Sequence, residues 1–131
     1  MTFDVNKTVA YWEQSAAYDF KTAFSLLKEA KYPYALFFGH LTLEKILKAL
    51  VVQQTGNHAP FTHSLPLLAS KLNINMPFDM AKQLAAFMEF YFEARYPDEV
   101  KMFYVKCTRT FADRHLKEIK KVYLWLQKKL P

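Results

Sequence analysis

Apolar residues recur at spacings of three and four along most of the chain, which is the period of an amphipathic α-helix. The pattern predicts helices over residues 5–30, 34–54, 64–72, 80–95 and 99–129. Short connections between such helices make neighbours antiparallel. We therefore expect an all-α antiparallel helical bundle of four long-to-medium helices and one short helix, folded as a single domain over residues 1–131.

Capping and helix-breaking residues mark the expected helix ends. Asp4, Ser64 and Asp79 precede apolar runs, and their side chains can accept hydrogen bonds from the free amide groups of a first turn. Pro33 and Gly56 are expected to end the first and second helices, because proline disrupts a helix interior and glycine readily adopts the left-handed backbone of a helix end.

The helix expected over 80–95 is apolar on nearly every side, so most of its surface must be buried. Such a helix lies either at the centre of the bundle or in a subunit interface. Met88, Phe92, Tyr96 and Phe103 extend this apolar surface and favour a symmetric homodimer. A central helix in a monomer is the alternative.

Composition narrows the class of protein. Two glycines among 131 residues disfavour an all-β fold and leave no glycine-rich loop for a classical NTPase or dinucleotide site, so no cofactor is expected. Cys107 is the single cysteine and is expected to be buried, which fits a reducing compartment. The chain shows no signal-peptide pattern and no apolar run near the ~18 residues of a membrane span. We expect a cytoplasmic protein without a membrane segment.

The net charge of +6 is unevenly distributed along the chain. Residues 1–100 hold nine Lys or Arg against ten Asp or Glu, whereas residues 101–131 hold nine basic residues against two acidic ones. This excess indicates either a polyanionic partner or a solvated, lysine-rich helix face. Lys117 and Lys121 are the candidate RNA- or nucleotide-binding residues of this segment.

Four stretches carry recognisable motifs in a fixed order. The first expected helix has a tryptophan followed by an acidic residue and alanines, and the second contains an EKxLKAL-like run. The third expected helix opens with a His-x-Leu motif, and an RYPD sequence precedes the last helix. The residues are Trp12, Ala16, Asp19 and Ala23; Tyr34–Phe38 with Leu43–Leu50; His63–Leu65 with Leu68; and Arg95–Asp98. On these residues the sequence resembles the HEPN domain family, from about Val9 to Leu130.

The resemblance implies an antiparallel bundle, often homodimeric, with functions linked to nucleotides or RNA. Some members are ribonuclease toxins of toxin–antitoxin pairs, and others are non-catalytic partners of a minimal nucleotidyltransferase encoded alongside. We therefore expect a nucleotide- or RNA-associated binding module that works with a nucleotidyltransferase partner. A metal-independent ribonuclease toxin and a non-catalytic dimeric scaffold are the alternatives.

The catalytic branch of the family carries an arginine followed, after four to six residues, by a histidine. Arg95 is followed by YPDEVKMFY, which contains no histidine. Arg109 and His115 have the required spacing and are the candidate catalytic pair. The imidazole can move a proton at a ribose hydroxyl, and the guanidinium can stabilise charge on the phosphate. A structural histidine near the apolar stripe is the alternative for His115.

Arg95 and Tyr96 have both a structural and a functional interpretation. Pro97 forces the chain out of the helix at Tyr96, so Arg95 can brace the corner while Asp98 caps the last helix. Alternatively, the two side chains line a cleft between helices, where tyrosine stacks on a base and arginine holds a phosphate.

The charged side chains of the second helix raise a similar choice. Glu44, Lys45 and Lys48 form either a polar binding site or a solvated face with an i,i+4 ion pair. Asp19 of the first helix is expected to pair with Lys48 or Arg95 across the bundle.

No metal site is expected. His58 and His63 flank Pro60 in a loop that lacks the further ligands of a zinc site. His63 is instead expected to hydrogen-bond a helix end or a loop carbonyl. Any ligand would then be held by side chains and helix ends alone.

Overall fold

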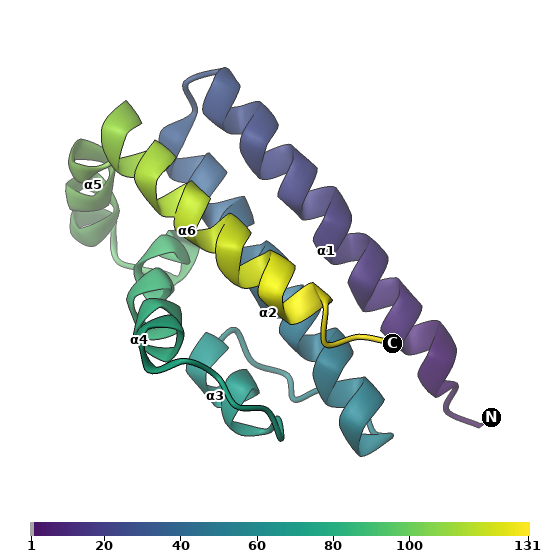
Figure 1. Cartoon of the computed structure of the whole chain (residues 1–131). Helices are drawn as coiled ribbons and strands as arrows, with labels where there is room; N and C mark the ends of the chain where they lie inside the picture. Colours follow the sequence, from purple (N-terminus) through teal and green to yellow (C-terminus); the bar gives the residue numbers. More distant parts are fainter. Residues whose placement is uncertain (1) are drawn as a thin grey trace.

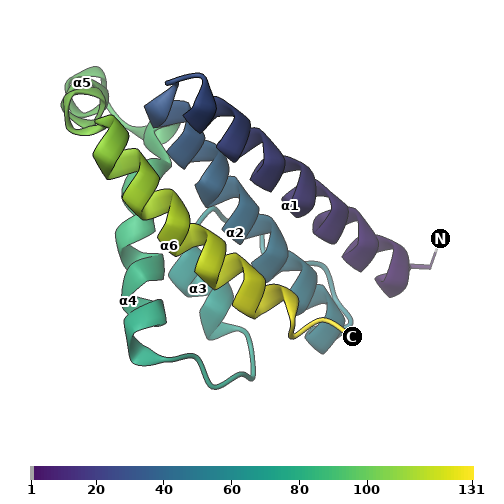
Figure 2. The same cartoon turned by 45° about the horizontal axis from the view of Figure 1, so that its top comes forward.

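The structure is a computed structural model that describes residues 2–131, and it is built from helices and short turns (Figures 1 and 2). The elements in chain order are α1 (Val5–Lys28), α2 (Tyr32–Thr55), α3 (Leu65–Ser70), α4 (Phe78–Ala86), the 3₁₀ turns η1 (Phe87–Phe90) and η2 (Phe92–Ala94), α5 (Pro97–Lys106) and α6 (Arg109–Gln127). The predicted all-α helical bundle is confirmed. None of the helices in residues 2–131 combines the length and apolar character needed to cross a membrane.

Helix α2 is the centre of the bundle. It packs against α1, α3, η1 and α6, and in both views α6 lies between α1 and the α3–α4 pair (Figures 1 and 2). Its side chains are buried around the whole helix, including Leu36, Leu43, Leu47 and Leu50. The prediction that the helix over 80–95 is the one buried on most sides is therefore wrong. The helix buried on most sides is α2, because only α2 has enough neighbouring elements to cover every face.

Gly39 allows α6 to approach α2 closely. A Cβ atom at this position would lie 2.8 Å from Ile119 Cδ1 and 3.1 Å from Leu116 Cδ1. Real Cβ atoms essentially never lie 2.8 Å from another heavy atom, so a side chain at residue 39 would require the terminal methyl group of Ile119 to shift.

The helix predicted over 80–95 ends at Ala86 and continues as two 3₁₀ turns. Phe87 and Phe90 then lie three residues apart on one side, which is the repeat of a 3₁₀ turn, and both are buried. The backbone at Tyr91, with φ −84° and ψ 67°, starts a new turn that buries Phe92 as well. Ala85 of α4 is exposed, so this segment is not buried on every side. The argument for a subunit interface over this segment is therefore weaker, and the homodimer stays a prediction.

The single helix predicted over 99–129 is also wrong, because the chain breaks at Cys107 and Thr108. The Thr108 side chain caps α6 by accepting a hydrogen bond of 3.2 Å from the Phe111 amide. Phe103 of α5 stacks on Phe92, whereas α6 packs along α2, and one straight helix cannot reach both partners. Val105, assigned by periodicity to the buried stripe, is 82% exposed as a result.

Local capping signals are confirmed at some helix ends and displaced at others. Asp4 and Ser64 accept hydrogen bonds from amides three residues on, and Gly56 ends α2 in the left-handed conformation with φ 71°. Asp79 and Asp98 lie inside the first turns of α4 and α5 rather than at the N-caps. Acidic side chains remain favourable there because they face the positive end of the helix dipole.

The turn between α1 and α2 also differs from the prediction. Helix α1 ends at Lys28, and Pro33 belongs to the first turn of α2, where its missing N–H group has no helical partner to lose. Ala30 closes the turn with φ 62°.

Candidate functional site

A cleft opens between the start of α3 and the turns that join α4 to α5. It encloses about 370 Å³ and is lined by His63, Ser64, Met88, Tyr91, Ala94, Arg95, Tyr96 and Glu99. The His-x-Leu opening and the RYPD junction therefore share one cleft, and Glu44 of the EKxLKAL-like run contacts His63 from α2. Three of the four distinctive stretches of the sequence meet at this place.

Glu44 is the buried charge behind the cleft, with 4% of its surface exposed. Its carboxylate lies 3.0 Å from Lys48 Nζ, 3.0 Å from His63 Nδ1 and 3.5 Å from His40 Nε2. Burial by itself raises the pKa of Glu44, but hydrogen bonds from His40, Lys48 and His63 outweigh burial and lower the pKa from 4.5 to about 2. The carboxylate is thus ionised at neutral pH.

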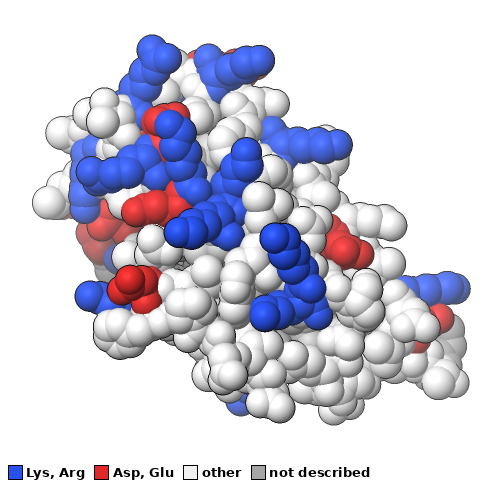
Figure 3. Space-filling model, viewed as in Figure 1, with Lys and Arg blue, Asp and Glu red and all other residues white. Residues whose placement is uncertain are grey.

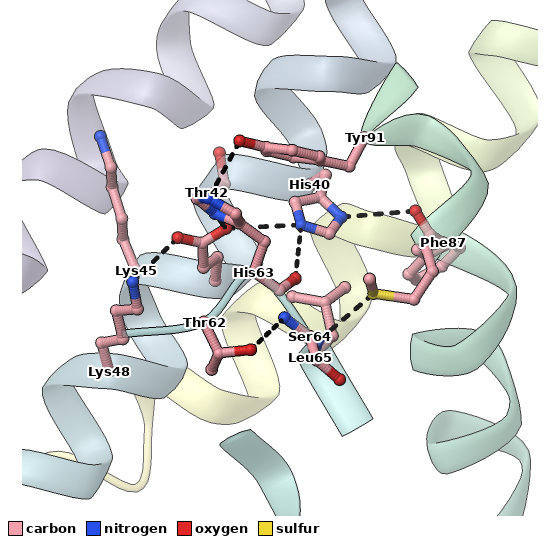
Figure 4. A network of polar contacts seen from close by, with 12 residues as sticks. His40, Thr42, Lys45, Lys48, Thr62, His63, Ser64, Leu65, Phe87 and Tyr91 are labelled. Atoms are coloured by element: carbon pink, nitrogen blue, oxygen red, sulfur yellow. Dashed lines mark hydrogen bonds and ion pairs between the residues drawn. The ribbon is translucent and has the colours of Figure 1, made fainter. Parts of the chain in front are cut away.

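His40 joins three elements beneath the cleft (Figure 4). Its ring is fully buried, with Nε2 3.0 Å from the His63 carbonyl oxygen and Nδ1 3.4 Å from the Phe87 carbonyl oxygen. Both carbonyl oxygens are acceptors and a neutral imidazole carries one N–H, so the ring donates a hydrogen bond to one of them and only contacts the other. A histidine within an apolar stripe is accommodated here because polar groups face both ring nitrogens.

His63 connects the buried carboxylate to the surface of the cleft. An ionised carboxylate only accepts hydrogen bonds, so Nδ1 of His63 carries a hydrogen and donates it to Glu44. Nε2 lies 3.1 Å from the Tyr91 hydroxyl, and the two rings stack with centroids 4.4 Å apart. The side chain is 47% exposed. The expectation that His63 bonds a helix end or a loop carbonyl is wrong, because its two ring nitrogens face Glu44 and Tyr91.

The Tyr91 hydroxyl keeps its proton at neutral pH. Burial raises the pKa of Tyr91, and the negative charges of Glu44 and Glu93 raise it further. The hydroxyl can therefore donate to Nε2 of a neutral His63. The result is a chain of hydrogen bonds from Glu44 through His63 to Tyr91 at the cleft.

Arg95 and Tyr96 occupy the outer part of the cleft. The Arg95 guanidinium lies 3.4 Å from both Glu99 Oε2 and the Met88 carbonyl oxygen, while 41% of the side chain remains exposed. Tyr96 is 80% exposed. Arg95 thus braces the corner and lines the cleft at the same time, and its contact with a phosphate stays a prediction.

The two lysines of α2 that are candidate RNA- or nucleotide-binding residues form ion pairs within the bundle. Lys48 is buried against Glu44 and touches the cleft only through that carboxylate. Lys45 Nζ lies 2.6 Å from Asp19 Oδ2 of α1. The prediction that Asp19 pairs with Lys48 or Arg95 is wrong, because Lys45 is the α2 residue that faces it.

Arg109 and His115 do not meet. They lie six positions apart on α6, which places their side chains about 120° apart around the helix axis. Arg109 lines a groove beside α1, whereas His115 lines a different depression with Asp79 of α4. His115 Nδ1 lies 2.6 Å from Glu118, so its partner is a neighbour on the same helix.

Lys117 and Lys121 lie on the exposed side of α6 and do not line the cleft. Lys117 forms an i,i+4 ion pair with Asp113 at 3.0 Å. Within residues 2–131, no group of three or more His, Cys, Asp or Glu side chains is arranged to hold a metal ion.

The sequence reasoning missed Tyr91 as a polar component of the site. Its contact with His63 spans 28 residues, and the Glu44–His63 contact spans 19. The available local signal was His40, a polar residue within an apolar stripe, four residues before an acid on the same helix face. Such spacing indicates a buried polar pair but does not identify the residues that join it.

Comparisons with known proteins agree with this fold. A family model described as the HEPN domain matches residues 9–130. No curated protein matches the chain. The crystal structure of TT1696 from Thermus thermophilus is similar, with 22% identity and a TM-score of 0.79 over 93% of this chain and 98% of that chain. ST0689, described as an archaeal HEPN homologue, has 20% identity and a TM-score of 0.72 over 94% of this chain and 98% of that chain. The structural likeness establishes the fold, and the family match over residues 9–130 shows that the chain belongs to the HEPN domain family.

Proposed function

We propose that this HEPN-domain protein is a nucleotide- or RNA-binding module of the cytoplasm that works with a nucleotidyltransferase partner. The observation that carries the proposal is the cleft in which Arg95 and Tyr96 lie beside His63 and Tyr91. The exposed Tyr96 ring offers a face on which a base can stack. The partly exposed Arg95 offers a fork of donors for a phosphate.

The geometry favours a ligand smaller than a duplex. A cleft of about 370 Å³ has the size of a small-molecule site, and two tyrosines and a histidine supply its aromatic surface. A nucleotide, or one nucleotide of an RNA strand, fits this mixture of a cation with aromatic rings. The contact of 3.4 Å between Glu99 and the Arg95 guanidinium must break when a phosphate binds Arg95.

The test is the binding of a fluorescent ATP analogue to the whole chain, followed by anisotropy. We expect Arg95→Ala to weaken binding about tenfold, because a charge-assisted contact to phosphate is lost. Tyr96→Ala should weaken binding about fivefold or more through lost stacking, and Tyr96→Phe should retain it. Arg114→Ala is the matched control, since Arg114 is an exposed arginine outside the cleft. Equal losses in Arg95→Ala and Arg114→Ala would contradict the proposed site.

A metal-independent ribonuclease is the second candidate function, and the Glu44–His63 contact favours it. Glu44 orients the imidazole through Nδ1, as a carboxylate does in many proton-transfer sites. Nε2 of His63, once the Tyr91 hydroxyl has turned away from it, would take the proton of a ribose 2′-hydroxyl whose oxygen attacks the adjacent phosphorus. The bond to the 5′-oxygen then breaks, and that oxygen takes a proton from solvent. Arg95 would stabilise the phosphate charge.

An RNA cleavage assay in the presence of EDTA separates the two functions. If the chain is a ribonuclease of this kind, His63→Asn abolishes cleavage and His115→Asn retains it. If Arg109 and His115 are the catalytic pair, the pattern is reversed. The absence of cleavage by the wild-type chain, together with nucleotide binding, supports the binding module.

The homodimer and the nucleotidyltransferase partner complete the proposal. Helix α5 carries the exposed apolar side chains Met102 and Val105, which are 74% and 82% exposed and suit a protein contact. Light scattering of the wild type and of Val105→Glu tests whether this face joins two copies. Co-purification with a nucleotidyltransferase encoded in the neighbouring gene tests the partner.

A further inference from the structure

A second depression lies between the C-terminal half of α1 and the first turns of α6. It encloses about 560 Å³, more than the cleft, and shares no lining residue with it. Helix α1 contributes Phe20, Lys21, Phe24 and Lys28, and α6 contributes Arg109 and Lys120. We call this depression the α1–α6 groove.

The α1–α6 groove is strongly basic. Lys21, Lys28, Arg109 and Lys120 are all exposed, and none of them forms an ion pair with any carboxylate in residues 2–131. The single acid of the lining, Asp113, is paired with Lys117. Figure 3 shows Lys and Arg side chains gathered over the part of this face where α1 ends and α6 begins. Four cations on two facing helices make a positive channel whose charge is not neutralised by the chain itself.

Aromatic rings line the same groove. Phe20 and Phe24 are half-buried and meet edge to face, with centroids 5.1 Å apart. Phe20 also stacks on the buried Tyr123 at 4.7 Å, which fixes its orientation. Lys120 Nζ lies 6.0 Å from the centroid of the Phe24 ring. The rings are thus held in place from below while part of their surface remains open to the groove.

We propose that the α1–α6 groove binds a single-stranded segment of nucleic acid. Lysines and an arginine that track a backbone, combined with aromatic faces on which bases stack, are the two components of sequence-tolerant single-strand binding. Lys21, Lys28, Arg109 and Lys120 contact the phosphates, and Phe20 and Phe24 contact the bases. A base-paired duplex cannot offer its ring faces in this way. The groove goes beyond the cleft of the proposed function, because it would hold the strand at a separate place.

The experiment measures the binding of a fluorescein-labelled U12 RNA to the full chain by anisotropy between 50 and 200 mM NaCl. The groove variant is Lys28→Gln with Lys120→Gln. The matched control is Lys7→Gln with Lys82→Gln, which removes the same charge from exposed positions outside the groove. We expect the groove variant to weaken binding at least tenfold and to lower the salt slope by about 1.4, because each lost phosphate contact on a single strand is worth about 0.7. The control should change affinity less than twofold.

Phe24→Leu tests the stacking separately, since leucine keeps an apolar side chain in the half-buried position. We expect at least a fivefold loss of affinity without a change in salt slope. Equal losses in the groove and control variants overturn the proposal, because they show that net charge alone attracts the strand. Equal binding of a U12–A12 duplex, or equal competition by polyglutamate, also overturns it. The groove variant should leave binding of the fluorescent ATP analogue within twofold, because Lys28 and Lys120 do not line the cleft, so failure of the groove and failure of the cleft are distinguishable.

Discussion

The Nδ1 atom of His63 lies 3.0 Å from the carboxylate of Glu44, which is itself held by Lys48 on the next turn of α2. A buried acid therefore sets the orientation and the tautomer of an exposed imidazole. The same carboxylate contributes to the stability of the bundle, because its contacts exist only in the folded chain. Stability and the geometry of the cleft are coupled through Glu44.

The pH dependence of unfolding should reveal this coupling. The pKa of Glu44 is lowered from 4.5 to about 2 in the folded chain, so its stabilisation is complete above about pH 4.5 and is lost as the pH falls towards 2. The loss should be about 3 kcal/mol in the free energy of unfolding. Urea unfolding between pH 7 and pH 2 measures it.

Glu44→Gln is the matched test of that assignment. The variant should lose about 3 kcal/mol or more at pH 7, because Lys48 is left buried without its counter-charge. It should also show a weaker dependence on pH below 4.5. Glu89→Gln is the control: Glu89 pairs with Lys106 at the surface, so its loss should cost about 1 kcal/mol or less. A parallel pH profile in wild type and Glu44→Gln would refute the role of Glu44.

Gly39→Ala should destabilise the chain by about 1–3 kcal/mol, because the added methyl group meets Ile119 at 2.8 Å. Thermal unfolding followed by circular dichroism measures the loss. Adding Ile119→Val to Gly39→Ala should recover part of it, since the shorter side chain removes the atom in contact. If the two substitutions are simply additive, the clash is not the cause.

Thr108→Ala should lower the free energy of unfolding by about 0.5–2 kcal/mol, because the hydroxyl caps the first turn of α6. Thr108→Ser keeps the acceptor and should keep most of the stability. Thr110→Ala, two residues into α6, is the control and should have little effect. A larger effect of Thr110→Ala than of Thr108→Ala would argue against the cap.

The Cys107 thiol should react slowly with iodoacetamide. It is 6% exposed, and burial together with the nearby Glu89 raises its pKa to about 12 despite the opposing charge of Lys106. At pH 8 we expect alkylation at least ~100-fold slower in the folded chain than in guanidinium chloride, because the thiolate is the reactive form. Mass spectrometry of timed samples gives both rates. Fast alkylation of the folded chain would show that the α5–α6 corner opens readily.

Periodicity located the helical segments well but not the breaks within them. The apolar pattern from residue 99 to 129 is compatible with one helix, and Thr108 inside it looks like any other polar position. The break arises because Phe103 packs on Phe92 while α6 must follow α2. A local apolar repeat does not show that the two halves of a segment pack against different, distant partners.

The candidate site was predicted in part. The RYPD junction drew attention to Arg95 and Tyr96, and both line the cleft. The spacing of Arg109 and His115 indicated a pair that the helix separates by about 120°. Spacing along the chain defines proximity only when the backbone conformation between the two residues is known.

The sequence by itself determined the helical class, most capping residues and the basic character of the last segment, because each of these depends on residues within a few positions of one another. The tertiary structure alone decided that α2 is the central helix and that Glu44, His63 and Tyr91 form one chain of hydrogen bonds. It also brought the lysines of α1 and α6 to the same groove. These arrangements depend on which helix faces pack together, and that packing is determined by all the core side chains jointly.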